Sequence, residues 1–259
     1  MAKFPFPVFA AAVLLLVTNV AWLAKPAGAQ QPVVIELFTS EGCSSCPPAD
    51  AMLTKLSHQR DTNIAKLILL EEHVEYWNNG GWKDPFSGPT YTDRQYDYTK
   101  ELHLQTAYTP QIVIDGHLQA SGNNPRAVQY LILEAAKTSM PAAVSLNRIS
   151  PDKLQVSVNN AAGEKLDVLL AVTEDDLINN VRAGENSGRT LTHSAVVREL
   201  HRLGSTADGK FDKTVNLPDK SGWKKDNLRV IVLVQNPSSG VIAGAAEVPY
   251  VATASAGGK

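Results

Sequence analysis

The two cysteines of this 259-residue chain are Cys43 and Cys46, and two serines separate them. They follow a β-branched run at 33–38 and a turn, and they precede 49–59, where apolar residues recur at helical spacing. A helix N-terminus at this point stabilises a thiolate through its unpaired N–H groups and its dipole. Because the thiolate is the nucleophile of disulfide exchange, the pattern predicts redox chemistry. We expect an exposed Cys43 to attack first and Cys46 to resolve the mixed disulfide.

Other interpretations of the cysteine pair stay open at this point. A static disulfide requires no catalysis, and a soft-metal site could use both thiolates and a histidine. A structural zinc site usually requires four ligands, and the chain has no second cysteine pair. The prolines at 47 and 48 also leave the helix start undecided. If Cys43 caps the helix, one intrahelical hydrogen bond is lost, whereas a Ser45 cap places both prolines among the unpaired first positions.

Residues 1–29 have the features of a secretory signal. Lys3 gives a thin positive start, 9–24 is almost entirely apolar, and Ala27-Gly28-Ala29 offers small residues for cleavage. The apolar run of about 16 residues is shorter than the ~20 that a membrane span requires, although an uncleaved anchor is the alternative. We therefore expect a secreted or periplasmic protein with no stable membrane span after cleavage. Thiols tend to pair in such oxidising compartments.

Composition excludes several classes of protein. Hydrophobic residues make up 44% of the chain and charged residues 19%, which does not fit a disordered, collagen-like or polytopic membrane protein. The formal net charge is −2, without the clustered basic excess of a nucleic-acid-binding surface. We expect no nucleic-acid partner.

The chain changes character at Met140-Pro141. Before it, in 31–140, β-rich runs alternate with stretches of helical periodicity. After it, in 141–251, short β-rich runs recur between turn signals, a spacing typical of a β-sandwich. We expect 252–259, which is small and polar, to be a flexible tail.

Thr109-Pro110 precedes an apolar strand at 112–114 and a turn at Asp115-Gly116. Together with the Cys-x-x-Cys pair, this order resembles the thioredoxin superfamily. The resemblance implies an α/β thioredoxin-like domain, a cis bond before Pro110, and a substrate lying along Thr109. It also implies that the cysteines need no organic cofactor.

Glu36 lies in the middle of an apolar run, where a carboxylate is costly unless it is paired or protonated. In thioredoxins a buried acid on the strand before the redox motif helps to deprotonate the resolving cysteine. The resemblance therefore gives Glu36 a role as general base for Cys46. The alternative is an exposed glutamate on an edge strand.

The resemblance becomes narrower in 36–50, 71–86 and 184–198, which look like a bacterial family of uncharacterised secreted proteins with a thioredoxin-like domain. By thioredoxin standards 73–86 is an insertion, and long loops of this kind are often functional. His73 could hold a proton near Cys43, and Trp77 and Trp82 could line a substrate groove. A second small core beneath the loop is the alternative for all three.

The second half contributes four polar residues of interest: Asn186, Arg189, His193 and Arg198. They could line either the contact between the halves or a ligand pocket. We expect them to pack between the halves.

These observations predict an exported protein with an α/β thioredoxin-like domain at 31–140 and a β-sandwich-like domain at 141–251. Its expected activity is thiol–disulfide exchange with a protein or small-molecule disulfide or dithiol. One alternative is a copper-binding, metallochaperone-like module in which His73 or His193 joins the cysteines. Another is a non-catalytic envelope binding module with a static disulfide.

Overall fold

The structure is a computed structural model, and it describes residues 30–251. The expected signal peptide at 1–29 and the expected flexible tail at 252–259 lie outside the described residues. Within the described part, no helix is long and apolar enough to cross a membrane.

The first half of the chain alternates strands and helices as the apolar periodicity predicts. Its elements are β1 (Pro32–Thr39), α1 (Pro47–Ser57), β2 (Lys66–His73), the 3-10 helix η1 (Asn78–Gly80), α2 (Pro89–Glu101), β3 (Gln111–Ile114), β4 (Leu118–Ser121) and α3 (Pro125–Ala135).

The second half consists almost entirely of strands. Its elements are β5 (Ala142–Ser150), β6 (Lys153–Asn160), β7 (Asp167–Glu174), β8 (Leu177–Asn180), β9 (Thr190–His193), β10 (Val196–Ser205), β11 (Lys210–Asn216), the 3-10 helix η2 (Lys225–Asn227), β12 (Leu228–Gln235) and β13 (Ile242–Pro249).

One eight-stranded sheet runs through both halves, in the order β13-β12-β7-β10-β2-β1-β3-β4. The prediction of a thioredoxin-like α/β domain followed by a β-sandwich is therefore wrong. Strands hold 41% of the described residues and helices only 18%, so the fold is mostly β. A second sheet, β11-β6-β5, covers part of the large one, and β8 and β9 form a separate hairpin.

The two halves join at the outer edge of β2. Val196 of β10 pairs with Glu71 in parallel, and the Glu71 N–H donates to the carbonyl of Ala195 at 2.8 Å. Unpaired strand edges offer N–H and C=O groups that another strand can satisfy. The partner strand lies more than a hundred residues away in the sequence, so local periodicity gives no sign of this pairing.

Alternating side chains of β1 pack on opposite faces of the sheet. Ile35 and Leu37 contact α1 in a core that includes Ala49 and Leu53. Val34, on the other face, belongs to a core that reaches into the second half. A third core fills the space between the β11-β6-β5 sheet and the large sheet. The apolar faces of the two halves are therefore buried partly against each other.

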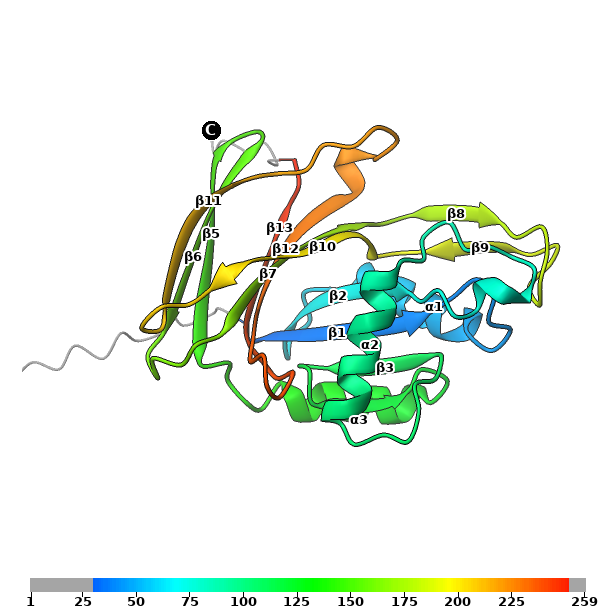
Figure 1. Cartoon of the computed structure of the whole chain (residues 1–259), viewed down its shortest axis with the longest axis horizontal. Coiled ribbons are helices and arrows are strands. Elements are labelled where there is room, and N and C mark those ends of the chain that lie inside the picture. The colour runs from blue at the N-terminus through cyan, green and yellow to red at the C-terminus, as the bar shows by residue number, and fades with distance from the viewer. Residues whose placement is uncertain (1–29, 252–259) are drawn as a thin grey trace, which may run out of the picture.

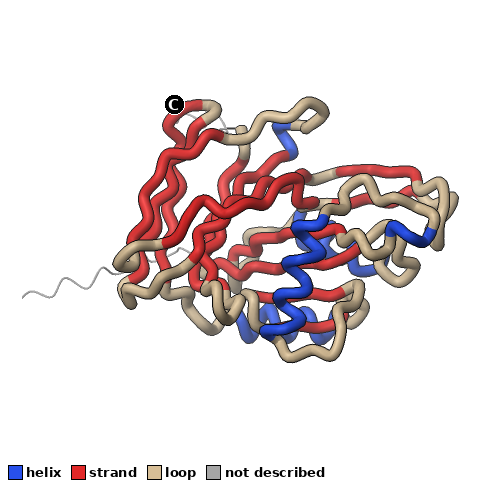
Figure 2. Tube along the Cα trace, viewed as in Figure 1, coloured by secondary structure: helices blue, strands red, loops and turns tan. Residues whose placement is uncertain are grey.

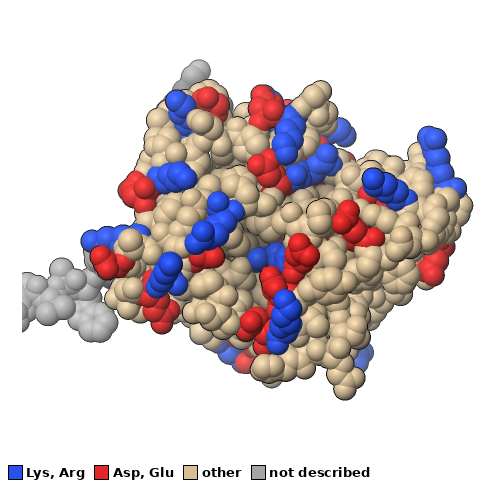
Figure 3. Space-filling view, in the orientation of Figure 1, with Lys and Arg blue, Asp and Glu red and all other residues tan. Residues whose placement is uncertain are grey.

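Figure 1 shows the helices on one side of the molecule and the β5, β6 and β11 strands on the other, with the long strands of the second half between them. The β8–β9 hairpin extends as an arm over the end of the molecule where α1 begins, and Figure 2 shows the same strand-dominated trace. Basic and acidic side chains are interspersed on the face in Figure 3. That face carries no large patch of a single sign.

Candidate functional site

Cys43 and Cys46 form a disulfide directly before α1. Cys46 is the N-cap residue of this helix, so neither Cys43 nor Ser45 caps it. The prolines at 47 and 48 therefore occupy the first two helical positions, where a missing N–H costs little. The Ala49 N–H donates to the Cys46 carbonyl at 2.8 Å.

Both cysteines are fully buried, so the expectation of an exposed Cys43 is wrong. The loop at 184–188, between β8 and β9, is bonded to the segment that holds them. Asn186 Nδ2 donates to the carbonyls of Glu41 and Cys43, each at 2.9 Å. The Ser44 N–H donates to the Glu185 carboxylate at 3.0 Å. The 184–188 loop of the second half therefore covers the disulfide segment and is hydrogen-bonded to it.

The Thr109–Pro110 peptide bond is cis, and Pro110 lies beside the first turn of α1. Gly122 lies against both Pro110 and Ala49 of α1. A Cβ added at Gly122 would lie 2.8 Å from the Ala49 Cβ and 3.1 Å from the Pro110 Cβ, so these two side chains are close together. Trp77 Nε1 donates to Thr109 Oγ1 at 2.8 Å. The structure therefore places Pro110, Thr109 and Trp77 around the start of α1, near the disulfide.

Trp82 and His73 belong to a polar cluster that adjoins the disulfide loop at Glu41. Trp82 Nε1 donates to Glu41 Oε2 at 2.8 Å, and Asn179 Nδ2 donates to both oxygens of the same carboxylate. His73 Nδ1 lies 2.7 Å from Asp84 Oδ2. Burial lowers the pKa of His73, but the Asp84 and Glu71 carboxylates together outweigh this effect and raise it to about 9.

His193 completes this cluster from the second half. Its Nδ1 lies 2.6 Å from Glu71 Oε1, and its Nε2 lies 3.4 Å from Glu41 Oε1. Burial opposes ionisation of His193, yet the nearby carboxylates, chiefly Glu71 and Glu41, together raise its pKa well above the ordinary value. One ligand atom from each of Glu71, His73 and His193 lies within 4.8 Å of the other two. Among the described residues, these three form a group that could hold a metal ion.

Asp50 is a site residue that the sequence analysis missed. It is buried on α1 four residues after Cys46, so the two lie on the same helix face. Thr39 Oγ1 donates to Asp50 Oδ1 at 2.6 Å, while Oδ2 has no hydrogen-bond partner among the described residues. Burial and then the Glu71 charge raise the pKa of Asp50 to about 7. The four-residue spacing from Cys46 is the signal that could have found it.

Glu36 is not brought together with the cysteines. It is buried on β1, between β2 and β3, and its oxygens accept from Arg94 Nε and the Tyr98 hydroxyl, both at 2.6 Å. Arg94 and Tyr98 belong to α2, which lies across the sheet from α1. The strand is central, so Glu36 is not an exposed edge residue either.

The remaining polar residues of the second half divide between two places. Arg189 donates to Asn186 Oδ1 at 2.8 Å and supports the loop over the disulfide. Arg198 lies 3.5 Å from Glu174 and over the Phe86 ring. Asn186 and His193 contact the first half directly. The alternative of a copper site made of both cysteines and a histidine stays a prediction.

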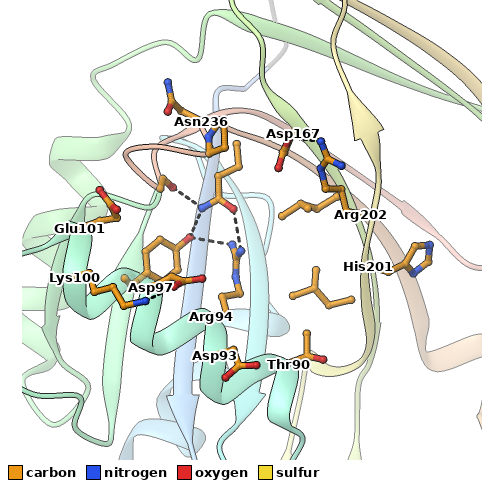
Figure 4. Close-up of a pocket in the computed structure, with 16 residues that line it drawn as sticks. Thr90, Asp93, Arg94, Asp97, Lys100, Glu101, Asp167, His201, Arg202 and Asn236 are labelled. Carbon is orange, nitrogen blue, oxygen red and sulfur yellow. Dashed lines mark hydrogen bonds and ion pairs between the residues drawn. The ribbon is translucent and has the colours of Figure 1, made fainter.

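A cleft of about 580 Å³ lies away from this region, between α2 and the strands of the second half. Figure 4 shows charged side chains of both signs around it, including Asp97, Lys100 and Arg202, with Arg94 held by Gln235 and Tyr98 at its base. Its lining shares no residue with the disulfide loop. We therefore place the candidate site at the disulfide and not in this cleft.

Comparison with known proteins supports the fold and gives no activity. Residues 34–235 match a family described as "Protein of unknown function (DUF1223)". A protein from Agrobacterium tumefaciens of known crystal structure is 27% identical with a TM-score of 0.69, over 86% of this chain and 96% of that chain. A domain of the outer membrane lipoprotein Omp28 from Porphyromonas gingivalis is 12% identical with a TM-score of 0.25, over 41% and 84%. No curated protein matches.

Proposed function

Since this chain belongs to the DUF1223 family of proteins of unknown function, its activity must be argued from its own residues, and we propose that Cys43 and Cys46 carry out thiol–disulfide exchange. The observation that carries the proposal is the position of the disulfide. It lies directly before α1, with a buried, partly unpaired carboxylate one helical turn away. A crosslink that only stabilises the fold needs no such carboxylate.

The stabilisation expected from this disulfide is small. Under the loop-entropy model, closing a loop this short stabilises the folded chain by only about 2 kcal/mol, compared with ~3 kcal/mol for a 15-residue loop. The chain also buries several large apolar cores without help from a crosslink. Structural stabilisation is therefore a weak reason for the pair, which favours reversible chemistry.

The proposed half-reaction oxidises a substrate dithiol. A substrate thiolate attacks Cys43 Sγ, the Cys43–Cys46 bond breaks, and Cys46 leaves as a thiolate. The second substrate thiolate then attacks the substrate sulfur of the mixed disulfide, and Cys43 leaves. Two electrons pass to the cysteine pair, the substrate departs as a disulfide, and two protons end on the cysteines. The reverse sequence reduces a substrate disulfide.

Asp50 supplies the proton exchange for Cys46 in this proposal. A carboxyl group whose pKa lies near 7 can both give and accept a proton at neutral pH. The two prolines that open α1 have no N–H groups, so the first turn offers fewer donors to a thiolate than a helix without them. Proton transfer to Cys46 through Asp50 therefore matters more here than stabilisation by the helix terminus.

Substrate would reach the sulfurs beside Thr109 and Trp77, after the loop at 184–188 moves aside. The buried cysteines require that movement, since a thiolate cannot attack a sulfur that it cannot contact. We place the reaction in a secreted or periplasmic compartment, where thiols are oxidised. The Cys43–Cys46 disulfide and the signal features of 1–29 support this localisation.

The test compares the mature chain with Cys43→Ser and Cys46→Ser in the oxidation of a fluorescent dithiol peptide. We expect the wild type to oxidise one equivalent of peptide as its own disulfide is reduced, and both variants to oxidise none. Incubated with the disulfide form of the peptide, Cys46→Ser should trap a mixed disulfide through Cys43 with release of a peptide thiol, and Cys43→Ser should not. Asp50→Asn should slow exchange on the order of 10²-fold at pH 7, as for loss of a general acid–base group.

Asp97→Asn is the matched control, because Asp97 is an exposed aspartate on α2. A wild-type protein that oxidises the peptide no faster than the variant with both cysteines replaced would show that the disulfide is static. Copper binding by the reduced chain that needs both cysteines would favour the metallochaperone-like alternative.

A further inference from the structure

We propose that Glu41, Glu71, His73 and His193 form a closed site for a zinc-like divalent cation, between the first half of the chain and the β8–β9 hairpin. Glu41 precedes the disulfide, Glu71 and His73 come from β2, and His193 comes from β9. All four residues are fully buried. The site is distinct from the exchange proposed for the cysteines and uses neither sulfur.

The Nε2 atoms of the two histidines carry the argument. Within residues 30–251 neither atom has a hydrogen-bond partner, although both belong to fully buried residues. His73 Nε2 lies 3.3 Å from Glu71 Oε1, and His193 Nε2 lies 3.4 Å from Glu41 Oε1. Tetrahedral zinc with bonds of 2.0–2.1 Å places neighbouring ligand atoms about 3.3–3.4 Å apart. Both pairs therefore have the spacing of adjacent metal ligands.

The other nitrogen of each ring is already held by a carboxylate. His73 Nδ1 lies 2.7 Å from Asp84 Oδ2, and His193 Nδ1 lies 2.6 Å from Glu71 Oε1. Metal-binding histidines usually donate their second N–H to a carboxylate or a carbonyl, which fixes the ring orientation. Each ring is thus oriented with Nε2 left over for a ligand. Asp84 acts as a positioning residue, since it would touch His73 and not the metal.

The charge of the cluster also suits a cation. Glu41, Glu71 and Asp84 are buried carboxylates, and their ion-pair partners among the described residues are the two histidines. A buried carboxylate is costly unless a positive charge compensates it. Protonated His73 and His193 supply that compensation when no ion is bound, and a divalent cation would take the place of their Nε2 protons and leave both imidazoles neutral.

The types of ligand atom indicate which metal ion the site would bind. Two imidazole nitrogens with carboxylate oxygens suit zinc and its transition-metal neighbours, whereas calcium and magnesium prefer oxygen ligands alone. Four protein ligands in a buried position leave no open coordination site, which is the pattern of structural zinc. The ion would join β2 and the disulfide loop to the hairpin that covers it.

The test uses the mature chain, which is unfolded in denaturant with a chelator present and then refolded with zinc. Refolding is needed because a closed site must take up its ion while the chain folds. We expect one equivalent of zinc to remain after desalting, and Co²⁺ refolded in its place to give the visible absorption of a tetrahedral complex. His73→Asn with His193→Asn should abolish retention. Asp84→Asn should weaken zinc affinity roughly 10–100-fold, as loss of a group that orients a ligand does.

His58→Asn is the matched control, because His58 is an exposed histidine outside the cluster. The variant with both cysteines replaced by serine should keep its zinc. Loss of zinc in that variant, or a folded wild type that retains none, would overturn the proposal even if the histidine variants do not fold. Since exchange activity is measured separately, its failure leaves the zinc result unaffected, and the reverse also holds.

Discussion

Two buried acids show how the environment of a single residue decides its role. Glu36 is neutralised by Arg94 and the Tyr98 hydroxyl, and its position on the α2 side of the sheet separates it from the cysteines. Asp50 has one unpaired oxygen and lies on the cysteine side. From the sequence, a carboxylate stands out only where it interrupts an apolar pattern. Glu36 interrupts such a pattern. The partners of Glu36 come from α2, 58 and 62 residues away along the chain, whereas Asp50 accepts from Thr39 on the neighbouring strand β1.

Asp115 gives a prediction about stability and pH. It is 6% exposed, its Oδ1 accepts from the Val34 N–H at 2.7 Å, and burial raises its pKa to about 6. The folded state therefore binds a proton more tightly than the unfolded state, so the free energy of unfolding falls as pH rises from about 4 to 6. Asp115→Asn keeps an acceptor and removes the charge. We expect it to stabilise the protein by about 2–3 kcal/mol at pH 7.5 and by little below pH ~4.

Urea unfolding across this pH range measures the effect, with Asp176→Asn as the control. Asp176 also has a positive φ, of 58° compared with 48° at Asp115, but it is exposed. Asparagine tolerates this backbone region, so both variants are compatible with the fold. A stability gain for Asp115→Asn that is equally large at pH 4 would show that the charge is not its cause.

At the scale of elements, the β8–β9 hairpin is the part of the second half that meets the disulfide. Its loop at 184–188 bonds the carbonyls of Glu41 and Cys43, and His193 at its base enters the buried cluster. From the sequence, these polar residues were expected to pack between the halves. Their partners could not be assigned, because the contacts join segments 122 to 145 residues apart.

Asn186→Ala tests this cover. The variant loses two donors to buried carbonyls, which favours local opening of the loop by about 1–3 kcal/mol. A change of about 1.4 kcal/mol is a factor of ten in a population, so dithiothreitol should reduce the Cys43–Cys46 disulfide roughly tenfold faster. The rate is followed by alkylation of the released thiols under native conditions.

Ser187→Ala is the control in the same loop, since Ser187 Oγ donates to the Arg182 carbonyl and not to the disulfide segment. Its reduction rate should match the wild type. Equal rates for Asn186→Ala and the wild type would mean that the loop does not limit access to the sulfurs.

At the scale of the whole molecule, the shared sheet makes the halves depend on each other. β2 is paired on both edges, with β1 of its own half and β10 of the other. Ile68 and Leu70 of β2 pack in one core with Ile231 and Leu233 of β12. A boundary near residue 140 stays a prediction about the chain, but the hydrophobic cores extend across it.

Residues 30–140 expressed alone should therefore not fold cooperatively. The segment would expose the apolar face that Ile231 and Leu233 cover, together with the unpaired edge of β2. We expect poor amide dispersion by NMR and no sharp thermal transition, while residues 30–259 unfold in one transition. A dispersed spectrum and a cooperative melt for the segment would contradict this interpretation.

The local elements were the predictable part of this protein. Apolar and β-branched runs located β1, β3, β5, β6, β7, β11, β12 and β13, and helical spacing located α1, because these patterns depend on neighbours in the sequence. The strands β8, β9 and β10 were not predicted. The Cys-x-x-Cys pair before a helix and the Thr109–Pro110 segment were visible in the same way. The candidate disulfide site could therefore be identified from the sequence.

The tertiary structure decided how these elements combine. It joined β2 to β10 in one sheet, buried the disulfide beneath the 184–188 loop, and placed His193 against Glu71 and Glu41. Each of these outcomes depends on which strand edge is free and which apolar face lacks a partner after the local elements form. Those are properties of the assembled surfaces, so no pattern within a short stretch of residues contains them.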